Sequence, residues 1–467
     1  MKKKIGVILV LGAGLLSCSG DDDVTSVVKE EVPETAADSI RNAVAFTGKV
    51  VSRQFLGGTE DDQIHDLLVL ENGVLAVGSS SSIDGDLSGK VEGGEDYWIA
   101  RLDTQNRIQW SKAYGGNGED EARSVLATKD GGYLVSGYTL SSNADEFEDN
   151  QGFFDQWLLK LNATGSKVWS KLYGFAGDDR VFKTVETSDG GFISAGFLDV
   201  TSSGGEGRKI AAKAFEAKKH GFGEFWVHKL NAEGEVQWRN YYGGSSNEEC
   251  FDAVATPDGG AILVGATESP GSTEFNVSRN NGSYDFWIIK IDAEGKLLWE
   301  KAYGGSGIER AYAVEATSDG NYIVVGDTRS TDADIPFLGG DADVFAIKID
   351  PSGNALWKKT YGGSDFDSAA AVTVDKDGNY IIAGSTRSKD QHISENKGQN
   401  DYLVLKVDPS GKLVWNFTDG TENIDLAQSV AVTNSGQIIV TGLAYRGPGT
   451  VDTDKGKNDA LILTLEE

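Results

Sequence analysis

Seven carboxylates occupy one position of a repeated sequence, and they are the most regular candidates for chemistry in the chain. Each follows the first residue of a Gly-Gly-like pair by five positions, where an innermost strand is expected to begin. As a ring at the mouth of a channel, they could receive a cation or a polar ligand. Alternatively, each accepts backbone N–H bonds from an adjacent loop, a structural role that suits seven equal copies. The seven residues are Asp62, Asp120, Asp179, Glu248, Glu309, Asp367 and Asp425. Both interpretations also apply to a second set, Asp96, Asp155, Glu224, Asp285, Asp343, Asp401 and Asp459.

One loop has the oxygen spacing of a calcium-binding segment. Calcium takes six to eight oxygen ligands, which one short segment can supply when they are spaced to wrap the ion. Here position 5 is a serine, and the flanking segments are expected to be strands rather than helices, so a solvated acidic loop is the alternative. Ca²⁺ is the one cofactor that the sequence suggests. The candidate ligands are Asp84, Asp86, Ser88, Glu92 and Glu95, at positions 1, 3, 5, 9 and 12, with Gly89 at position 6.

A basic segment interrupts the otherwise acidic chain in the third repeat. Arg208–His220 carries five Lys or Arg and one Glu, a net charge of +5 − 1 = +4. Its apolar residues could share one face of a helix and dock an acidic partner. The alternative is a helix that packs on its own repeat and compensates the surrounding negative charge. The candidate docking residues are Arg208, Lys209, Lys213, Phe215, Lys218 and Lys219.

The sequence contains no recognisable catalytic constellation, and we predict no catalytic residue. Cys250 follows Glu248 and Glu249, whose charge raises the pKa of a thiol and makes it a poor nucleophile. The four histidines are dispersed without paired ligand spacing, at His65, His220, His228 and His392. A carboxylate pair at the channel mouth, as in an enzyme that acts on polysaccharides, stays open as an alternative.

Composition excludes some partners and some classes of protein. The 467 residues carry a formal net charge of −29, which repels nucleic acid and anionic lipid headgroups. Two cysteines cannot form a disulfide framework. Seven prolines exclude a proline-rich disordered chain, although glycine is abundant at 60 residues. A folded, glycine-rich, acidic chain remains.

A repeat determines the architecture that must position these residues. The string Trp-x-x-x-Tyr-Gly-Gly, with degenerate copies, places its first glycine position at 57, 115, 174, 243, 304, 362 and 420. Each unit predicts four short strands, with an Asp-Gly or Asn-Gly hairpin between the first two. The third strand, such as 285–292, is apolar on both faces and must be covered on both. Radially stacked sheets provide that cover, so we predict an all-β, seven-bladed β-propeller of four-stranded blades.

The two ends of the repeat region complement each other. The last unit stops at its third strand, around 461–464, and lacks an outer strand. The segment 46–56 reads as an outer strand with no sheet of its own. Pairing the two would complete the last blade and remove both open edges. The propeller is therefore expected to span residues 46–467 and to be monomeric.

The N-terminus is expected to be a targeting segment. Three lysines precede an apolar run from Ile5 to Leu16, about 18 Å of helix, which is too short to span a membrane of about 30 Å. Residues 15–18, Leu-Leu-Ser-Cys, resemble the bacterial lipobox, which implies a signal peptide over 1–17 and lipidation of Cys18, with palmitate among the acyl groups. Residues 18–45 then form an acidic, flexible tether. Ser19 resembles an outer-membrane sorting signal, and Asp21–Asp23 resembles the surface-export tag of Bacteroidetes lipoproteins.

The repeats themselves resemble a known family. Strings such as Asp285–Gly295 and Ser318–Gly326 are similar to the secreted bacterial and archaeal seven-bladed β-propeller repeats. The resemblance implies an extracellular module without one shared chemistry. We therefore expect a non-enzymatic binding or scaffolding module for an envelope protein or an extracellular glycan, held at the outer membrane and cell surface by its lipid. A carbohydrate-binding protein or a polysaccharide-acting enzyme is the alternative.

Overall fold

The computed structural model describes residues 43–87, 90, 94–142, 150–203, 220–446 and 458–467. These residues form 28 β-strands, and no helix occurs among them. Accordingly, no helix in this part of the chain is long and apolar enough to cross a membrane. The predicted signal peptide, Cys18 and all of the tether except residues 43–45 lie outside the described residues.

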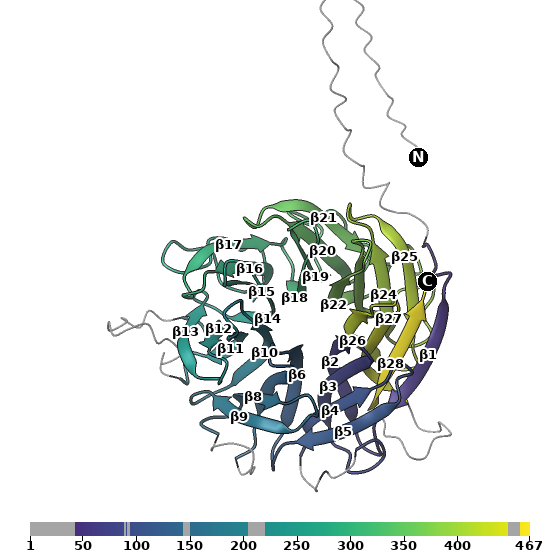
Figure 1. The fold of residues 1–467 in the computed structure, drawn as a ribbon. Helices are drawn as coiled ribbons and strands as arrows, with labels where there is room; N and C mark the ends of the chain where they lie inside the picture. Colours follow the sequence, from purple (N-terminus) through teal and green to yellow (C-terminus); the bar gives the residue numbers. More distant parts are fainter. Residues whose placement is uncertain (1–42, 88–89, 91–93, 143–149, 204–219, 447–457) are drawn as a thin grey trace, which may run out of the picture.

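Seven four-stranded antiparallel sheets surround a central axis, as the sequence predicts (Figure 1). The blades are numbered in chain order, and their strands run from the axis outwards. Blade 1 consists of β2 (Asp62–Leu70), β3 (Gly73–Ser80), β4 (Asp96–Leu102) and β5 (Ile108–Tyr114). Blade 2 consists of β6 (Asp120–Ala127), β7 (Tyr133–Thr139), β8 (Asp155–Leu161) and β9 (Lys167–Tyr173). Blade 3 consists of β10 (Asp179–Glu186), β11 (Phe192–Asp199), β12 (Gly223–Leu230) and β13 (Val236–Tyr242). Blades 4 and 5 are β14 (Glu248–Ala255), β15 (Ala261–Thr267), β16 (Asp285–Ile291), β17 (Leu297–Tyr303); and β18 (Glu309–Ala316), β19 (Tyr322–Thr328), β20 (Asp343–Ile349), β21 (Ala355–Tyr361). Blade 6 is β22 (Asp367–Val374), β23 (Tyr380–Thr386), β24 (Asp401–Val407), β25 (Leu413–Asp419).

Blade 7 closes the ring with strands from both ends of the chain. It consists of β26 (Asp425–Val432), β27 (Ile438–Tyr445), β28 (Asn458–Glu466) and β1 (Lys49–Leu56). β1 pairs antiparallel with β28, so that Arg53 lies opposite Leu463. Figure 1 shows these two strands side by side at the edge of the ring. The predicted closure by the N-terminal strand is confirmed.

The core lies between the blades rather than within a single sheet. Second and third strands are buried over almost their whole length, because a neighbouring sheet covers each face. Val264 and Phe286 of blade 4 share one apolar cluster with Val324 and Phe345 of blade 5. The rings of Phe286 and Phe345 are 5.0 Å apart. Doubly apolar third strands are therefore the sequence signature of radial stacking.

The Trp-x-x-x-Tyr motif connects each outer strand to the next blade. In blade 4, Tyr303 donates its hydroxyl hydrogen to the carbonyl of Gly353 in blade 5, at 2.6 Å. The Trp299 ring lies against the same glycine, where a Cβ would come within 2.8 Å of it. Gly353 has φ = +80°, a conformation that glycine adopts without strain. Equivalent tyrosine–glycine bonds join Tyr114 to Gly165, Tyr173 to Gly234, Tyr242 to Gly295 and Tyr361 to Gly411.

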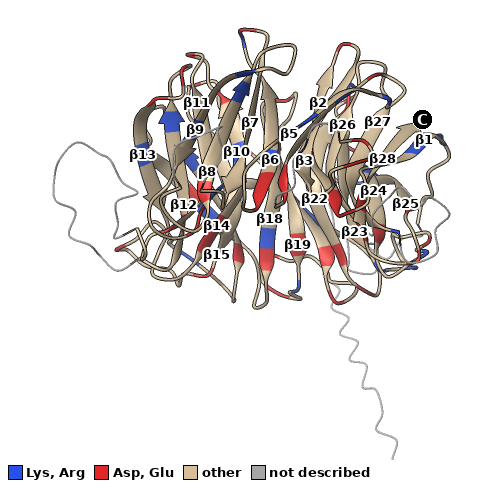
Figure 2. Cartoon of the chain, turned by 90° about the horizontal axis from the view of Figure 1, so that it is seen from below, with Lys and Arg blue, Asp and Glu red and all other residues tan. Residues whose placement is uncertain are grey.

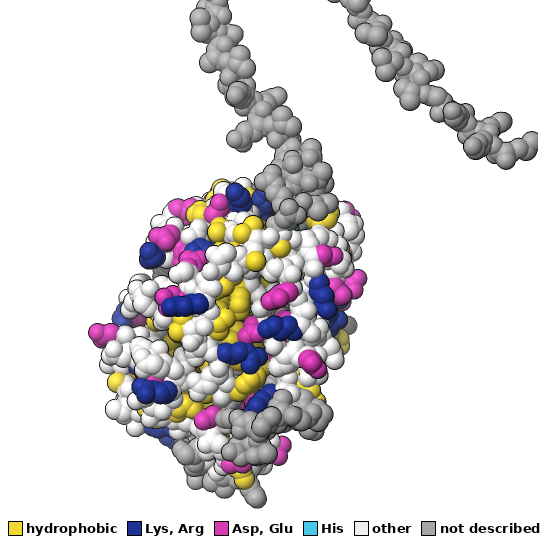
Figure 3. Space-filling view, turned by 90° about the vertical axis from the view of Figure 1, so that its right-hand side faces the viewer, with side chains coloured by type: hydrophobic (Ala, Val, Ile, Leu, Met, Phe, Trp, Pro, Cys, Tyr) yellow, Lys and Arg dark blue, Asp and Glu magenta, His cyan; other side chains and the backbone are white. Residues whose placement is uncertain are grey.

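The outer surface of the ring carries charges of both signs. Figure 3 views the side of the ring that carries β1, where apolar side chains lie among Lys, Arg, Asp and Glu. Val50 and Val51 of β1 are exposed there, at 44% and 46%. Seen edge-on, inner strands such as β18 also carry both acidic and basic residues (Figure 2). The chemically varied positions of these inner strands define the site described next.

Candidate functional site

The seven predicted ring acids begin the seven innermost strands, and each is 0–1% exposed. Each carboxylate accepts a hydrogen bond from the backbone N–H four residues earlier, in the Gly-Gly loop. The bonds run from Gly58 to Asp62 at 2.6 Å, Gly116 to Asp120 at 2.8 Å, Phe175 to Asp179 at 2.6 Å, Gly244 to Glu248 at 2.7 Å, Gly305 to Glu309 at 2.7 Å, Gly363 to Asp367 at 2.7 Å and Thr421 to Asp425 at 2.5 Å. These are the contacts of the structural role.

Hydroxyl groups from the end of the second strand complete this arrangement in most blades. In blade 5, Thr328 and Ser330 donate to Glu309 at 2.8 and 2.6 Å. Burial nevertheless raises the pKa of several of these carboxyls, to about 8 for Asp179 and about 6 for Asp367. The hydrogen bonds oppose that increase, because they stabilise the charged form.

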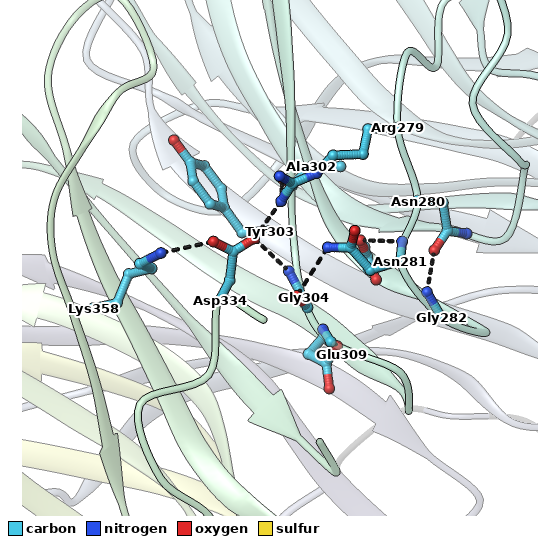
Figure 4. Close-up of polar contacts among 12 residues, drawn as sticks. Arg279, Asn280, Asn281, Gly282, Ala302, Tyr303, Gly304, Glu309, Asp334 and Lys358 are labelled. Atoms are coloured by element: carbon cyan, nitrogen blue, oxygen red, sulfur yellow. Dashed lines mark hydrogen bonds and ion pairs between the residues drawn. The ribbon is translucent and has the colours of Figure 1, made fainter. Parts of the chain in front are cut away.

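The second set of acids lies beside the first, on the other side of the same loop. Asp285 accepts the N–H of Asn281 at 2.9 Å, and Asn281 in turn donates to the carbonyl of Gly304 at 3.0 Å (Figure 4). A Cβ at Gly304 would overlap the carboxylates of both Asp285 and Glu309. The first glycine is therefore required because two buried carboxylates flank it. The same overlap occurs at Gly115, Gly243, Gly362 and Gly420.

Neighbouring loops of blades 4 and 5 are joined by charge. Asp334 pairs with Lys358 at 2.7 Å and with Arg279 from the long loop of blade 4 (Figure 4). Burial opposes ionisation, but the two cations hold the pKa of Asp334 below its usual value. Asp334 also accepts the N–H of Gly304 at 3.4 Å. Asp334 therefore links the long loops of blades 4 and 5 to each other and to the Gly-Gly loop between them.

Part of the predicted calcium loop lies within the described residues. Asp84 accepts the N–H of Thr59 at 2.8 Å, and Asp86 accepts the N–H of Gly57 at 2.9 Å. The residue between them, Gly85, has φ = +65°. Both carboxylates therefore hold the Gly-Gly loop of blade 1.

The same turn recurs in blades 5 and 6 without the calcium spacing. Asp332 accepts the N–H of Ser306, and Asp390 accepts that of Ser364, both at 2.8 Å. The next residues are Ala333 and Gln391, each at φ = +54°, which is rare for residues with a Cβ. In both blades, the acid at the start of this turn accepts a backbone N–H from the neighbouring loop.

The remaining calcium candidates add little to the geometry. Glu95 accepts hydrogen bonds from Ser79 and, at 3.3 Å, from the amide of Gln63. Ser88 and Glu92 lie outside the described residues. Within the described ranges, no three His, Cys, Asp or Glu side chains are grouped as a metal site requires. Calcium binding by this loop stays a prediction.

The predicted docking segment also stays a prediction. Arg208, Lys209, Lys213, Phe215, Lys218 and Lys219 all lie outside the described residues. His220, at the end of the segment, is described, and its Nδ1 lies 2.9 Å from the Glu224 carboxylate. The structure places this one residue of the segment against its own blade.

The dispersed histidines and the cysteine have structural contacts. His228 is buried, with Nδ1 3.0 Å from the amide oxygen of Gln156, and burial lowers its pKa to about 3. Cys250 is buried, and its thiol pKa is raised well above the usual value by burial and then by Asp252. The prediction from the sequence assigned this increase in pKa to Glu248 and Glu249 instead. The contribution of Asp252 was not predicted, because the β-bulge between Cys250 and Asp252 interrupts the regular alternation of side chains between the two faces of the strand.

A cavity of about 790 Å³ occupies the central channel, and the sequence did not predict its lining. Each innermost strand has a register shift around its fourth residue, as between Ala311 and Ala313 in β18. The bulged residue is not paired with the second strand, and it lines the cavity. In blade order, the seven bulged residues are His65, Arg123, Phe182, Phe251, Tyr312, Ala370 and Gln428. They differ in chemistry at a position that the repeat otherwise makes equivalent.

An aromatic band forms one wall of this cavity. Phe182, Phe251 and Tyr312 come from three successive blades, with ring separations of 5.9 and 5.1 Å. Small residues form the wall in blade 6, where Ala370 and its neighbours leave Gly384 and Ser385 of the second strand in the lining. The cavity is therefore asymmetric although its scaffold is not.

Three of the seven residues that follow the bulged ones are charged, namely Asp66, Lys183 and Asp252. The Lys183 ammonium lies 3.7 Å from Asp66 and 3.9 Å from Asp252, so it bridges blades 1 and 4. The Asp66 carboxylate is the main reason that the pKa of Lys183 is raised. Glu315 lines the same cavity, and burial raises its pKa to about 7.

A second charged group lies beside the cavity at blades 1 and 2. The His65 Nε2 is 2.8 Å from Glu121, and the Arg123 guanidinium is 2.6 Å from the same carboxylate. Burial opposes ionisation of Glu121, but His65 and Arg123 lower its pKa far below the usual value. Comparison of the repeats could have identified the bulged positions, since the residue three after each ring acid differs in chemical type between blades.

Comparison with known proteins gives limited similarity, and no family model matches the chain. The regulatory protein FlaEY of Caulobacter vibrioides is 27% identical over 258 residues, 50% of this chain and 27% of that protein. The uncharacterized WD repeat-containing protein L264 of Acanthamoeba polyphaga mimivirus is 24% identical over 121 residues, 24% of this chain and 9% of that protein. The chain therefore matches only a minor part of the length of either protein.

Solved structures with similar folds are distant in sequence. The WD40 propeller domain of Doa1 is 14% identical with a TM-score of 0.47, covering 90% of this chain and 98% of that chain. The Pan2 WD40 domain of Neurospora crassa is 10% identical with a TM-score of 0.46, covering 90% and 97%. The seven sheets described above, rather than these likenesses, establish the fold.

Proposed function

We propose that this chain is a non-enzymatic binding or scaffolding module. The observation that carries the proposal is the ring of bulged residues, from His65 to Gln428, which varies in chemistry while the surrounding frame repeats. By contrast, the acids that begin the innermost strands, such as Glu309, are buried and accept hydrogen bonds from backbone N–H groups of the Gly-Gly loops. The varied positions face a cavity of about 790 Å³, a size that suits a small ligand or a partner's side chains.

The location of the module is part of the same proposal. The sequence from Lys2 to Cys18 supports a lipoprotein signal, with the lipid on Cys18 as the only membrane contact. Outer-membrane sorting and cell-surface exposure are supported by Ser19 and the acidic residues Asp21–Asp23. The proposed partner is an envelope protein or an extracellular glycan, and the propeller itself acts as a monomer.

Crosslinking in living cells tests this proposal. The tagged, lipid-anchored chain is crosslinked and its partners are identified by mass spectrometry. We expect one abundant envelope protein that is lost when 208–220 is deleted. The matched control replaces the exposed lysines Lys376 and Lys389 with glutamine and should retain the partner. Recovery of the same partner after the deletion would exclude the basic segment as its docking site. A surface glycan bound in place of any protein would identify the polymer as the partner.

A polysaccharide-acting enzyme is a second candidate, because carboxylates do line the channel. Glu315, with a pKa of about 7, can hold a proton near neutral pH, and Asp252 lines the same cavity. A panel of polysaccharides, assayed for released reducing ends, tests this candidate. Hydrolysis that is lost in Glu315→Gln would replace the binding proposal with an enzymatic one.

A further inference from the structure

We propose that the channel cavity binds an organic cation, a primary ammonium group on a short aliphatic chain. The inference rests on the proposed binding function and names the ligand chemistry of the same cavity. A free diamine and the lysine side chain of a peptide share this chemistry. Three features carry the inference: fixed carboxylates, an internal ammonium group already held among them, and aromatic rings in the same cavity lining.

The carboxylates are held in place before any ligand arrives. Asp66 accepts the N–H of Val125 from the neighbouring blade at 3.0 Å. Asp252 accepts the N–H of Val314, also from the next blade, at 2.8 Å. Such preorganised charges stabilise a cation without first reorganising.

The cavity already accommodates one ammonium group of the required kind. Lys183 extends between Asp66 and Asp252, within 4 Å of each. The charged lining residues include three acids, Asp66, Asp252 and Glu315, and two permanent cations, Lys183 and Arg123. When Glu315 is ionised, the three acids exceed the two cations by one, and this excess favours a further cation near Glu315.

The aromatic band supplies the other half of a cation site. The Arg123 guanidinium lies over Phe182, 5.5 Å from its centroid. By contrast, no Lys or Arg within the described ranges lies over the rings of Phe251 or Tyr312. A ligand ammonium beside Glu315 can use those ring faces, because cation–π attraction adds to the ionic attraction.

The volume and shape of the cavity limit the ligand. About 790 Å³ holds a chain of several carbon atoms, and Ala370 and Ala371 leave room opposite the aromatic wall. The aliphatic part would contact Val254 and the aromatic edges, which also line the cavity. An inorganic cation would use only the carboxylates.

Calorimetric titration of the intact lipidated chain in an uncharged detergent tests the inference. We titrate 1,5-diaminopentane, with 1,5-pentanediol as the neutral isostere and Na⁺ as the inorganic cation. Saturable binding of the diamine, with neither control binding comparably, is the expected result. Equal binding of the diol would overturn the inference, as would the absence of diamine binding. Nα-acetyl-lysine methylamide and free diamine are compared to decide between the two sources.

Two variants locate the binding. Glu315→Gln removes one charge without changing the shape of the side chain, and it should weaken diamine binding about tenfold or more. Phe251→Leu should weaken it through loss of the ring face, while Glu60→Gln, on an exposed loop, should not. Equal affinity of Glu315→Gln and Glu60→Gln would overturn the inference. If no diamine binds but the crosslinked partner is still recovered, the inference fails while the proposed function stands.

Discussion

The hydroxyl of Tyr303 donates to the carbonyl of Gly353 across the boundary between blades 4 and 5, at 2.6 Å. This bond explains why a tyrosine precedes the Gly-Gly pair in the repeat. It also places the Trp299 ring over a glycine that has no Cβ. The strongest sequence signal of the chain is therefore an inter-blade contact, not a feature of one sheet.

Removing that hydroxyl should weaken the contact between blades. Tyr303→Phe is expected to lower the free energy of unfolding by about 1 kcal/mol, because a buried carbonyl loses its donor. Denaturant unfolding measures the change. Tyr133→Phe is the control, since the Tyr133 hydroxyl has no hydrogen-bond partner in the described part of the chain. Equal losses in the two variants would contradict this role of Tyr303.

Adding a methyl group at Gly353 should lower the free energy of unfolding by more than backbone strain alone would. Gly353→Ala strains a residue at φ = +80° and also places Cβ against the Trp299 ring. Gly320→Ala strains a residue at φ = +79° but meets no atom within 4 Å. We expect about 1–2 kcal/mol of destabilisation at Gly320 and a larger loss at Gly353. Thermal unfolding of both variants measures the difference. Equal losses would show that the Trp299 ring moves aside without an energetic penalty.

The buried acids should make stability depend on pH. Burial, together with Asp367, raises the pKa of Asp343 to about 7 from 3.8. A raised pKa favours the protonated folded state, so this contribution is full below about pH 4 and is lost as the pH rises through about 7. Asp343→Asn, which keeps the acceptor for Gly339, should therefore gain stability over the unmodified chain on going from pH 5 to pH 8.

The size of that gain is set by the linkage between proton binding and folding, at about 1.4 kcal/mol per pH unit within the window. Denaturant unfolding at pH 5 and pH 8 measures it. Asp377→Asn, at an exposed turn, is the control and should show no such change. A pH-independent difference for Asp343→Asn would show that Asp343 titrates normally in the fold.

The calcium loop can be tested through its repeat equivalent. Asp84→Ala and Asp332→Ala each remove an acceptor for a loop N–H, so both should lose about 1–2 kcal/mol of stability. If the acids act only on the backbone, the two losses are equal with calcium and with a chelator. A loss that appears only at Asp84 and only with calcium would establish the metal site. Thermal unfolding under both conditions decides between these outcomes.

The proposed anchor makes a simple prediction about Cys18. Cys18→Ala removes the lipid attachment point, so the chain should lose radiolabelled palmitate and leave the membrane fraction. Fractionation and labelling of whole cells measure both effects. Ser17→Ala, which keeps the cysteine, is the control. Retention of Cys18→Ala in the membrane would show that another segment anchors the chain.

Local and periodic information was sufficient for the architecture. The spacing of the Trp-x-x-x-Tyr-Gly-Gly strings predicted seven blades, and the unmatched ends predicted closure through β1 and β28. Both predictions hold because each blade is a local hairpin stack, and because doubly apolar third strands can be buried only between two sheets. The Asp-Gly and Asn-Gly turns likewise depend on local backbone preference alone.

Only the tertiary structure decided which acids hold the frame and which residues face the channel. The carboxylate of Glu309 is directed into a loop rather than toward solvent, and nothing in its immediate sequence determines that direction. The bulged residues, His65 and Phe251 among them, converge from strands tens of residues apart. Their convergence depends on a register shift in every innermost strand and on the closure of the ring. The channel site is therefore set by long-range geometry, because a one-residue bulge changes the face of a side chain while leaving the local sequence pattern unchanged.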